Sequence, residues 1–163
     1  MPNFALTVRQ RMKVDNISKW GYLSLTALAV IILDIATKFI AVTTLSPGQS
    51  IKVLPGIFHI TLVLNKGAAF GLLKNHNSLF MALSFAVIFF IIVYTYRYKP
   101  ITSTILIAFG LILGGAIGNI IDRIRFGCVV DFFDFRIWPV FNIADSSITI
   151  GVIMLAWRSI FRK

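Results

Sequence analysis

The stretch GLILGGAIGNIIDRIRFG, residues 110–127, carries the pattern that decides the fold. It begins inside an apolar run at about residues 101 to 121, and at ~1.5 Å of rise per residue a helix of this length crosses a bilayer core of ~30 Å. Gly110, Gly114 and Gly118 recur every four residues, and such a ridge of small residues lets a second helix approach closely. The stretch therefore predicts a membrane-spanning helix that packs against another helix.

The composition extends this prediction to the whole chain. Hydrophobic residues make up 58% of the 163 residues and the mean hydropathy is +0.87, well above the values of soluble proteins. Further apolar runs lie at about 20 to 42, 78 to 97 and 141 to 159, so we expect an α-helical membrane protein with a single four-helix domain over residues 1–163. A basic segment precedes the first run, but no clear small-residue cleavage site follows it, which predicts an uncleaved first helix.

The charges of the chain favour a membrane surface over a nucleic acid. Sixteen Lys and Arg residues against six aspartates give a formal net charge of +10, which suits anionic lipid headgroups. Because there is no soluble basic domain, we expect no nucleic-acid binding. Four spans place both termini on one side, and nine Lys and Arg residues lie there against seven elsewhere. The positive-inside rule then predicts that both termini are cytoplasmic.

The connection between the first two spans carries a strand pattern. It is rich in Pro, Gly and Asn, and within FHITLVLN, residues 58–65, larger apolar side chains alternate with His59, Thr61, Val63 and Asn65. A period of two residues indicates a strand. We therefore expect a small amphipathic sheet on the outer membrane surface.

Five of the six aspartates gather at the outer end of the predicted bundle: Asp34, Asp122, Asp131, Asp134 and Asp145. Charged groups at membrane depth are costly and usually functional, so this gathering predicts a site. Individual members keep alternative interpretations. Asp34 has the i,i+4 spacing of a structural ion pair with Lys38, and Asp145 also suits an acid stabilised by a helix N-terminus. Asp134 is expected at the surface, with a catalytic partnership as the rival interpretation.

Further polar residues belong to the same end of the bundle. Asn119 shares a helix face with Asp122 and Arg123 through i+3 and i+4 spacing. Such a group either caps the helix and binds headgroups or contacts a substrate backbone, and the motif alone does not decide between these roles. Asn142 lies three residues before Asp145, on the same face if the fourth helix has begun.

Other catalytic chemistries fit the sequence poorly. His59 and His76 lack metal-ligand spacing, there is no glutamate, and no H-x-x-x-H or C-x-x-C occurs, so we expect no metal and no cofactor. Cys128 is the single cysteine, which excludes an internal disulfide, and it has no obvious activating histidine. No G-x-S-x-G nucleophile elbow is present.

Five blocks of the chain together resemble one protein family. DIATK, NKGAAFG, GGAIGNIIDR, VVDFFDF and FNIADSSI occur in this order between about residues 30 and 150. They resemble the recurrent blocks of the type II signal peptidases, the lipoprotein signal peptidase family. The resemblance implies four spans with a small extracytoplasmic β-cradle and a loop or helix that covers the site. The connection from Asp131 to Asp145 is short beside some relatives, so we expect the covering loop to differ.

The resemblance also implies residue roles. Asp131 and Asp145 match the catalytic pair of the family. Five residues match positions that bind substrate or line the site: Asn65, Gly67, Asn119, Arg123 and Asn142. Three match positions that support the fold: Asp34, Lys38 and Asp122.

In function, the resemblance implies a membrane aspartic endopeptidase that removes the signal peptide from diacylglyceryl-modified prolipoproteins, just before the lipidated cysteine. It implies a bacterial cytoplasmic (inner) membrane with the site at the outer leaflet, membrane lipids and cyclic peptide inhibitors as partners, and a monomer. The residues alone leave two alternatives. One is a small proton-coupled transporter with intramembrane carboxylates, although these acids cluster on one side. The other is a structural subunit whose acids pair with Arg123, Arg125 and Arg136.

Overall fold

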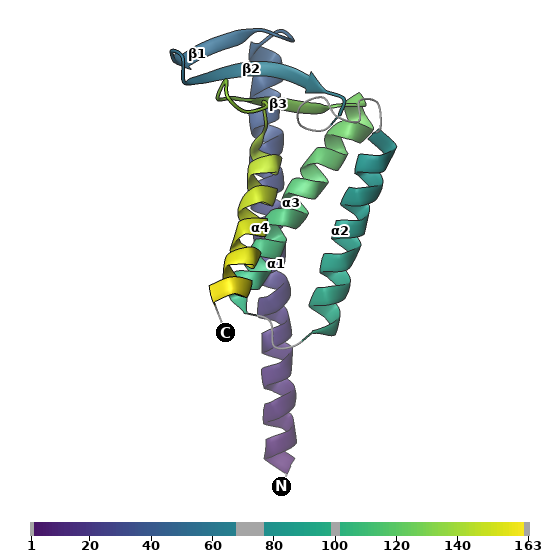
Figure 1. Ribbon diagram of the computed structural model, residues 1–163. Coiled ribbons are helices and arrows are strands. Elements are labelled where there is room, and N and C mark those ends of the chain that lie inside the picture. The colour runs from purple at the N-terminus through teal and green to yellow at the C-terminus, as the bar shows by residue number, and fades with distance from the viewer. Residues whose placement is uncertain (1, 68–76, 99–101, 162–163) are drawn as a thin grey trace.

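Helices and a small sheet make up the computed structural model in the order α1 (Pro2–Thr44), β1 (Ser50–Leu54), β2 (Phe58–Asn65), α2 (Asn77–Arg97), α3 (Ser103–Phe126), β3 (Val129–Asp134) and α4 (Ile143–Phe161) (Figure 1). The structure describes residues 2–67, 77–98 and 102–161, with side chains from residue 19 onward. The end of the NKGAAFG block after Gly67, His76 and the start of the predicted third span at residue 101 lie outside the described residues.

The predicted spans are confirmed as four helices long and apolar enough to cross a membrane: Lys19–Thr44, Asn77–Arg97, Ser103–Phe126 and Ile143–Phe161. α1 begins well before the predicted span, and α3 continues beyond the predicted end near residue 121. α3 stops where Gly127 adopts a left-handed conformation (φ 67°) and its N–H donates to the Arg123 carbonyl oxygen (3.1 Å). Asp122 and Arg123 therefore lie inside the last turns of α3.

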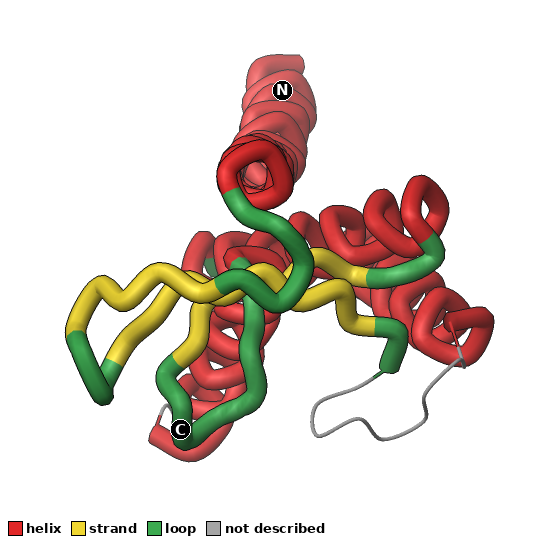
Figure 2. Tube along the Cα trace, turned by 90° about the horizontal axis from the view of Figure 1, so that it is seen from above, coloured by secondary structure: helices red, strands yellow, loops and turns green. Residues whose placement is uncertain are grey.

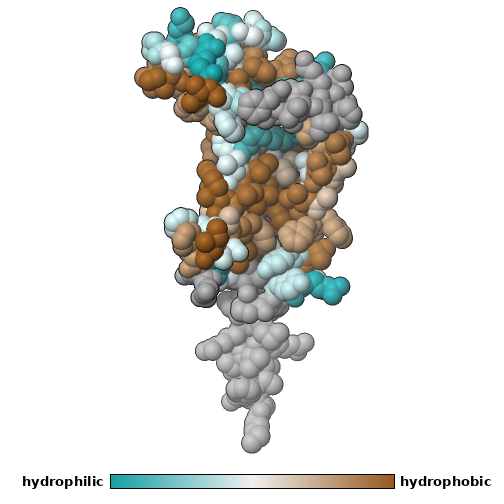
Figure 3. Space-filling view, in the orientation of Figure 1, coloured by the Kyte–Doolittle hydropathy of each residue, from teal (hydrophilic) through white to brown (hydrophobic). Residues whose placement is uncertain are grey.

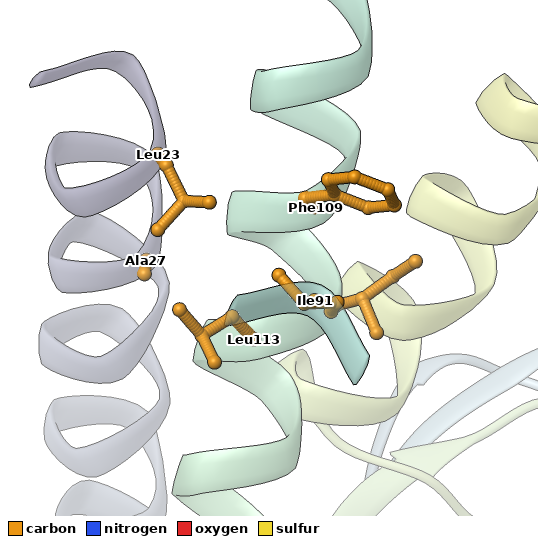
Figure 4. Packing of buried hydrophobic residues seen from close by; sticks show 6 residues of the cluster. Leu23, Ala27, Ile91, Phe109 and Leu113 are labelled. Atoms are coloured by element: carbon orange, nitrogen blue, oxygen red, sulfur yellow. The ribbon is translucent and has the colours of Figure 1, made fainter. Parts of the chain in front are cut away.

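α3 is the central helix of the bundle. Buried residues make up 67% of its most apolar window, against 11% in α2. One buried cluster joins α1, α2 and α3, and Figure 4 labels five of its members: Leu23, Ala27, Ile91, Phe109 and Leu113. The other helices are thus arranged around α3, which carries polar residues near its C-terminal end.

The glycine ridge predicted on α3 is confirmed as a helix contact. A Cβ added at Gly110 would lie 2.6 Å from the Thr26 Cβ, and one at Gly114 would lie 2.7 Å from the Ala27 carbonyl oxygen. α1 therefore packs directly against the ridge. On its other side α3 approaches the main chain of α4 just as closely at Gly115.

An antiparallel sheet in the order β1-β2-β3 crosses one end of the bundle (Figure 2). This sheet confirms the small β-structure that was expected there. β3, residues Val129–Asp134, was not predicted from the sequence. Five of its six residues are buried, so the segment VVDFFD lacks the alternation by which a half-exposed strand is recognised.

β2 confirms the predicted strand, but its predicted alternation is wrong. Its two buried residues, His59 and Leu62, are three positions apart. The register with β3 shifts between Ile60 and Val63, and a bulge of this kind moves the following side chains to the opposite face.

The outer faces of the helices are apolar. Large hydrophobic side chains such as Leu25, Phe89 and Ile153 are exposed, and Figure 3 shows hydrophobic residues over the helices, with more hydrophilic residues at the sheet and toward the opposite end. Such a belt suits contact with lipid along the helices. The chain is a multi-pass membrane protein whose sheet lies at one end of the bundle.

Candidate active site

Asp131 lies in β3 opposite Val63 of β2 and is only 1% exposed. Both of its carboxylate oxygens accept a hydrogen bond from an amide. Asn65 Nδ2 donates to Oδ2 (2.9 Å), and Asn142 Nδ2 donates to Oδ1 (2.7 Å). Because Asn65 ends β2 and Asn142 directly precedes α4, the pairing of β2 with β3 and the start of α4 together fix the orientation of this carboxylate.

Asp145 is the third residue of α4, and the start of that helix positions it. Asn142 Oδ1 accepts a hydrogen bond from the Asp145 N–H (2.8 Å), as an N-cap residue does. On the other side, Asn119 Nδ2 of α3 donates to Asp145 Oδ1 (2.8 Å). Since the Asn142 side chain also donates to Asp131, one amide links the two aspartates.

A buried ion cluster lies next to these amides. Lys38 Nζ is 2.7 Å from Asp34 Oδ2 and 2.9 Å from Asp122 Oδ2, so the i,i+4 pair of the sequence is present with a third member. Lys38 Nζ also donates to Asn119 Oδ1 (3.2 Å). With its oxygen occupied in this way, the Asn119 amide presents its NH₂ group to Asp145. The cluster thus orients a side chain that contacts Asp145.

The two acids of the cluster also hold the backbone of the site. Asp34 Oδ1 accepts a hydrogen bond from Ala144 N–H (2.9 Å), and Asp122 Oδ2 accepts one from Val130 N–H (3.0 Å). These bonds tie α1 to the start of α4 and α3 to β3, the segments that carry the two aspartates. The geometry agrees with the supporting roles implied for Asp34, Lys38 and Asp122, although the roles themselves stay predictions.

Both aspartates line a cavity of about 210 Å³. Four of the other residues expected to bind substrate line it as well: Asn65, Gly67, Asn119 and Arg123. The remaining lining comes from α2, β3 and the chain before α4: Phe80, Val129, Trp138, Pro139, Val140 and Phe141. Sequence reasoning missed these apolar residues, because their approach to the aspartates depends on tertiary packing. Asn142, which is fully buried, links the aspartates instead of lining the cavity.

Arg123 lies where this cavity meets an apolar groove. Its Nη1 donates to the Asn119 carbonyl oxygen (3.3 Å), and its guanidinium carbon lies 5.2 Å from the centre of the Phe80 ring. The groove, of about 440 Å³, runs between α2, α3 and α4 and shares Phe80, Asn119 and Arg123 with the cavity. The polar site is therefore continuous with an apolar groove among the membrane-spanning helices.

The environment of Asp131 raises the pKa of its carboxyl group toward neutral pH. Burial, followed by the charge of Asp145, raises the pKa of Asp131 from 3.8 to about 7. Hydrogen bonds from Asn65 and Asn142 and the charge of Lys38 oppose this rise. A pKa in this range lets a carboxyl group exchange a proton at neutral pH, as general acid and base catalysis requires.

Asp134 corrects an expectation, because it is buried (5% exposed) and not a surface residue. It lies opposite His59 in the sheet and accepts a hydrogen bond from Thr61 Oγ1 (2.7 Å). Burial alone would raise the pKa of Asp134, but the hydrogen bonds from Thr61 and the Arg136 backbone, with the charge of Arg136, lower it. Asp134 is thus an ion-paired carboxylate outside the cavity, which gives no support to its rival catalytic assignment.

The single cysteine is not activated as a nucleophile. Cys128 is buried, and burial raises the pKa of its thiol, which keeps the thiol protonated and unreactive. Within the described residues, no group of three His, Cys, Asp or Glu side chains comes together as metal ligands.

Comparisons with known proteins identify the family. Residues 26–161 match the family described as Signal peptidase (SPase) II. The chain is 46% identical over 131 residues to a lipoprotein signal peptidase of Halothermothrix orenii, covering 80% of this chain and 90% of that one. It is 47% identical over 135 residues to one of Moorella thermoacetica, covering 82% and 89%. A solved structure described as a bacterial membrane enzyme, determined by the in meso method at 1.9 Å resolution, matches with a TM-score of 0.79 and 36% identity over 88% of this chain and 95% of that one. The chain therefore belongs to the signal peptidase II family of membrane peptidases.

Proposed function

We propose that the chain is an aspartic endopeptidase that removes the signal peptide from diacylglyceryl-modified prolipoproteins, cutting just before the lipidated cysteine. The observation that carries this proposal is the placement of Asp131 and Asp145 in one cavity, linked through Asn142. Membership of the signal peptidase II family, and relatives named lipoprotein signal peptidases, support the substrate class. The same family membership gives no support to the transporter alternative.

In the proposed mechanism the two aspartates share one proton, because ionising both in a desolvated cavity is costly. The ionised carboxylate takes a proton from a water molecule, and this water attacks the scissile carbonyl carbon. The protonated carboxyl donates a hydrogen bond to the carbonyl oxygen and then assists departure of the leaving amine. The pKa of Asp131, raised to about 7 by burial and by Asp145, keeps this shared proton available at neutral pH.

The amides around the aspartates would keep the carboxylates aligned during this reaction. Asn65 and Asn142 hold the two oxygens of Asp131, and Asn119 holds one oxygen of Asp145. Arg123 and Asn119, which line both the cavity and the groove, would bind carbonyl oxygens of an extended substrate backbone. The apolar groove suits the apolar segment of a signal peptide.

We place both termini in the cytoplasm of a bacterial cytoplasmic (inner) membrane, with the site at the outer leaflet. The distribution of Lys and Arg supports this orientation. In the fold, the sheet and the start of α4 lie at the end of the bundle opposite to the start of α1 and the end of α4 (Figure 1). A diacylglyceryl-modified cysteine, held at a leaflet surface by its lipid, would meet the aspartates at that level.

The test is cleavage of a synthetic diacylglyceryl-modified prolipoprotein peptide by the purified chain in mixed lipid and detergent micelles. Asp131→Asn and Asp145→Asn should each abolish cleavage before the cysteine. Asp15→Asn changes the one aspartate outside the group of five at the predicted outer end, and it should keep the wild-type rate. A metal chelator should have no effect. Circular dichroism shows whether each variant keeps its helices. Wild-type turnover by either Asp131→Asn or Asp145→Asn refutes the two-aspartate mechanism.

A further inference from the structure

The β3–α4 loop, residues 135–141, forms one wall of the cavity, and backbone hydrogen bonds join its two ends. Phe133 N–H donates to the Phe141 carbonyl oxygen (2.8 Å), and Phe141 N–H donates to the Phe133 carbonyl oxygen (3.1 Å). Between these two residues, three consecutive positions line the cavity beside the aspartates: Trp138, Pro139 and Val140. The position of this loop therefore sets the shape of the cavity.

At its base the loop is packed through Phe135, whose ring lies 4.9 Å from that of Phe58 and 5.9 Å from that of Phe141, whereas its tip is largely exposed. Ile137 is 93% exposed and Trp138 is 61% exposed. The residue before them, Arg136, has a φ of 66°, in the left-handed region that residues other than glycine rarely adopt. Such a conformation persists when its surroundings hold it. The contacts of Arg136 therefore bear directly on what holds the exposed tip of the loop.

Arg136 is anchored first on Asp134. Its backbone N–H donates to Asp134 Oδ1 (2.9 Å), and its Nη1 lies 3.4 Å from Asp134 Oδ2. The buried Asp134 carboxylate is held in turn by the Thr61 hydroxyl of β2 (2.7 Å). The anchor is thus a fixed carboxylate at the end of β3.

A second anchor point lies on β2. Arg136 Nη2 is 2.7 Å from His59 Nδ1, and since a guanidinium only donates, Nδ1 is the acceptor. His59 is 4% exposed, and the Ser50 hydroxyl of β1 approaches the same ring nitrogen at 3.2 Å. The Arg136 side chain is therefore bound by β2 and β3, and a hydroxyl of β1 contacts the histidine that accepts from it.

We propose that Arg136 is a positioning residue that fixes the β3–α4 loop to the sheet and thereby sets the wall formed by residues 138–140. Neither of its partners, His59 and Asp134, is among the residues that line the cavity, so the anchor acts on substrate binding and leaves proton transfer between the aspartates unchanged. The expected effect on substrate binding rests on the proposed peptidase function. The structural part of the inference concerns the loop alone.

Two variants remove the anchor in different ways. Arg136→Gly suits the φ of 66° and so keeps the turn while it removes both side-chain contacts. His59→Leu removes the acceptor on β2 and leaves Arg136 in place. The matched control is Arg125→Ala, which removes another exposed arginine from the same end of the bundle, where it stacks on Phe126. Circular dichroism verifies folding, and His59→Leu carries the test alone if Arg136→Gly does not fold.

The first readout needs no catalysis. With Trp20→Phe and Trp157→Phe as background, Trp138 is the remaining tryptophan of the three in the chain, and acrylamide quenching of its fluorescence reports the loop. Arg136→Gly and His59→Leu should increase quenching, and Arg125→Ala should not. In cleavage of the lipidated peptide, both anchor variants should raise KM about tenfold, which is the size expected for a lost hydrogen bond to a charged group. Both should keep kcat within about twofold of the wild-type value. Arg136→Lys should restore part of the loss.

The outcomes separate the two proposals. Unchanged quenching in both anchor variants overturns the inference, and so does a fall in kcat with an unchanged KM. If the wild type does not cleave the peptide while quenching responds as expected, the anchoring of the loop stands and the proposed peptidase function is refuted.

Discussion

Replacing Asn142 separates the fold of the site from its chemistry. This fully buried side chain (0% exposed) caps α4 through Oδ1 at the Asp145 N–H (2.8 Å) and donates through Nδ2 to Asp131 Oδ1 (2.7 Å). Asn142→Ala removes both interactions. Asn142→Asp keeps the capping oxygen and places a second carboxyl group where the donor was.

The stability change follows from these contacts. Loss of an N-cap costs about 1 kcal/mol, and a buried group left without its hydrogen bond costs a further ~1–3 kcal/mol. We therefore expect Asn142→Ala to lower the free energy of unfolding by roughly 2–4 kcal/mol. Asn142→Asp should lose less at pH 5, because it keeps the cap and its protonated carboxyl can still donate to Asp131. SDS titration in mixed micelles, followed by tryptophan fluorescence, measures both changes.

The effect on catalysis ranks the two variants differently from the effect on stability. The hydrogen bond from Asn142 lowers the pKa of Asp131, so its loss should move that pKa above about 7 in both variants. Asn142→Asp adds a negative charge and should raise the pKa of Asp131 further. The alkaline limb of kcat/KM for the lipidated peptide should thus move upward from wild type to Asn142→Ala to Asn142→Asp. An unchanged or lowered alkaline limb in Asn142→Asp, or equal losses of stability in the two variants at pH 5, would refute this reasoning.

Three further predictions concern stability, and the same SDS titration measures each. Because the folded pKa of Asp131 lies above its usual 3.8, near 7, the folded state binds more protons between these values, and stability falls as pH rises through that window. Asp131→Asn should flatten this slope, and an unchanged slope contradicts the raised pKa. Lys38→Met leaves two buried carboxylates without their cation and should cost roughly 3–5 kcal/mol, whereas a neutral effect would show that the cluster contributes nothing. Gly115→Ala sets a Cβ against the main chain of α4 and should cost about 1–3 kcal/mol, while Gly21→Ala, with nothing within 4 Å, should leave stability unchanged or slightly higher. Equal effects of the two glycine changes would speak against the close helix approach.

The spans could be predicted from the sequence because hydropathy over a helix length is a local signal. The glycine ridge of α3 was predictable for the same reason, since its spacing lies within one helix. β3 was not predictable in this way. A strand that is buried along most of its length shows no alternation, and its identity depends on pairing with β2, which lies more than sixty residues earlier in the chain.

The sequence alone predicted only part of the site. The gathering of aspartates at one end indicated a site, but the assignment of Asp131 and Asp145 as the catalytic pair came from family resemblance. Asp131 and its rival Asp134 are both buried and both lie on β3. Their side-chain partners distinguish them. Asp131 accepts a hydrogen bond from the Asn142 amide at the start of α4, whereas Asp134 pairs with Arg136 in the β3–α4 loop. Contacts of this kind depend on tertiary structure, and a periodicity in the sequence does not contain them.

The most direct test of the central claim is the kcat/KM of the double variant Asp131→Asn/Asp145→Asn beside the two single variants, measured on the lipidated peptide. If the aspartates act as one unit with a shared proton, each single variant should lose as much activity as the double variant. Single losses that add up in the double variant, or substantial cleavage by either single variant, would contradict the catalytic pair.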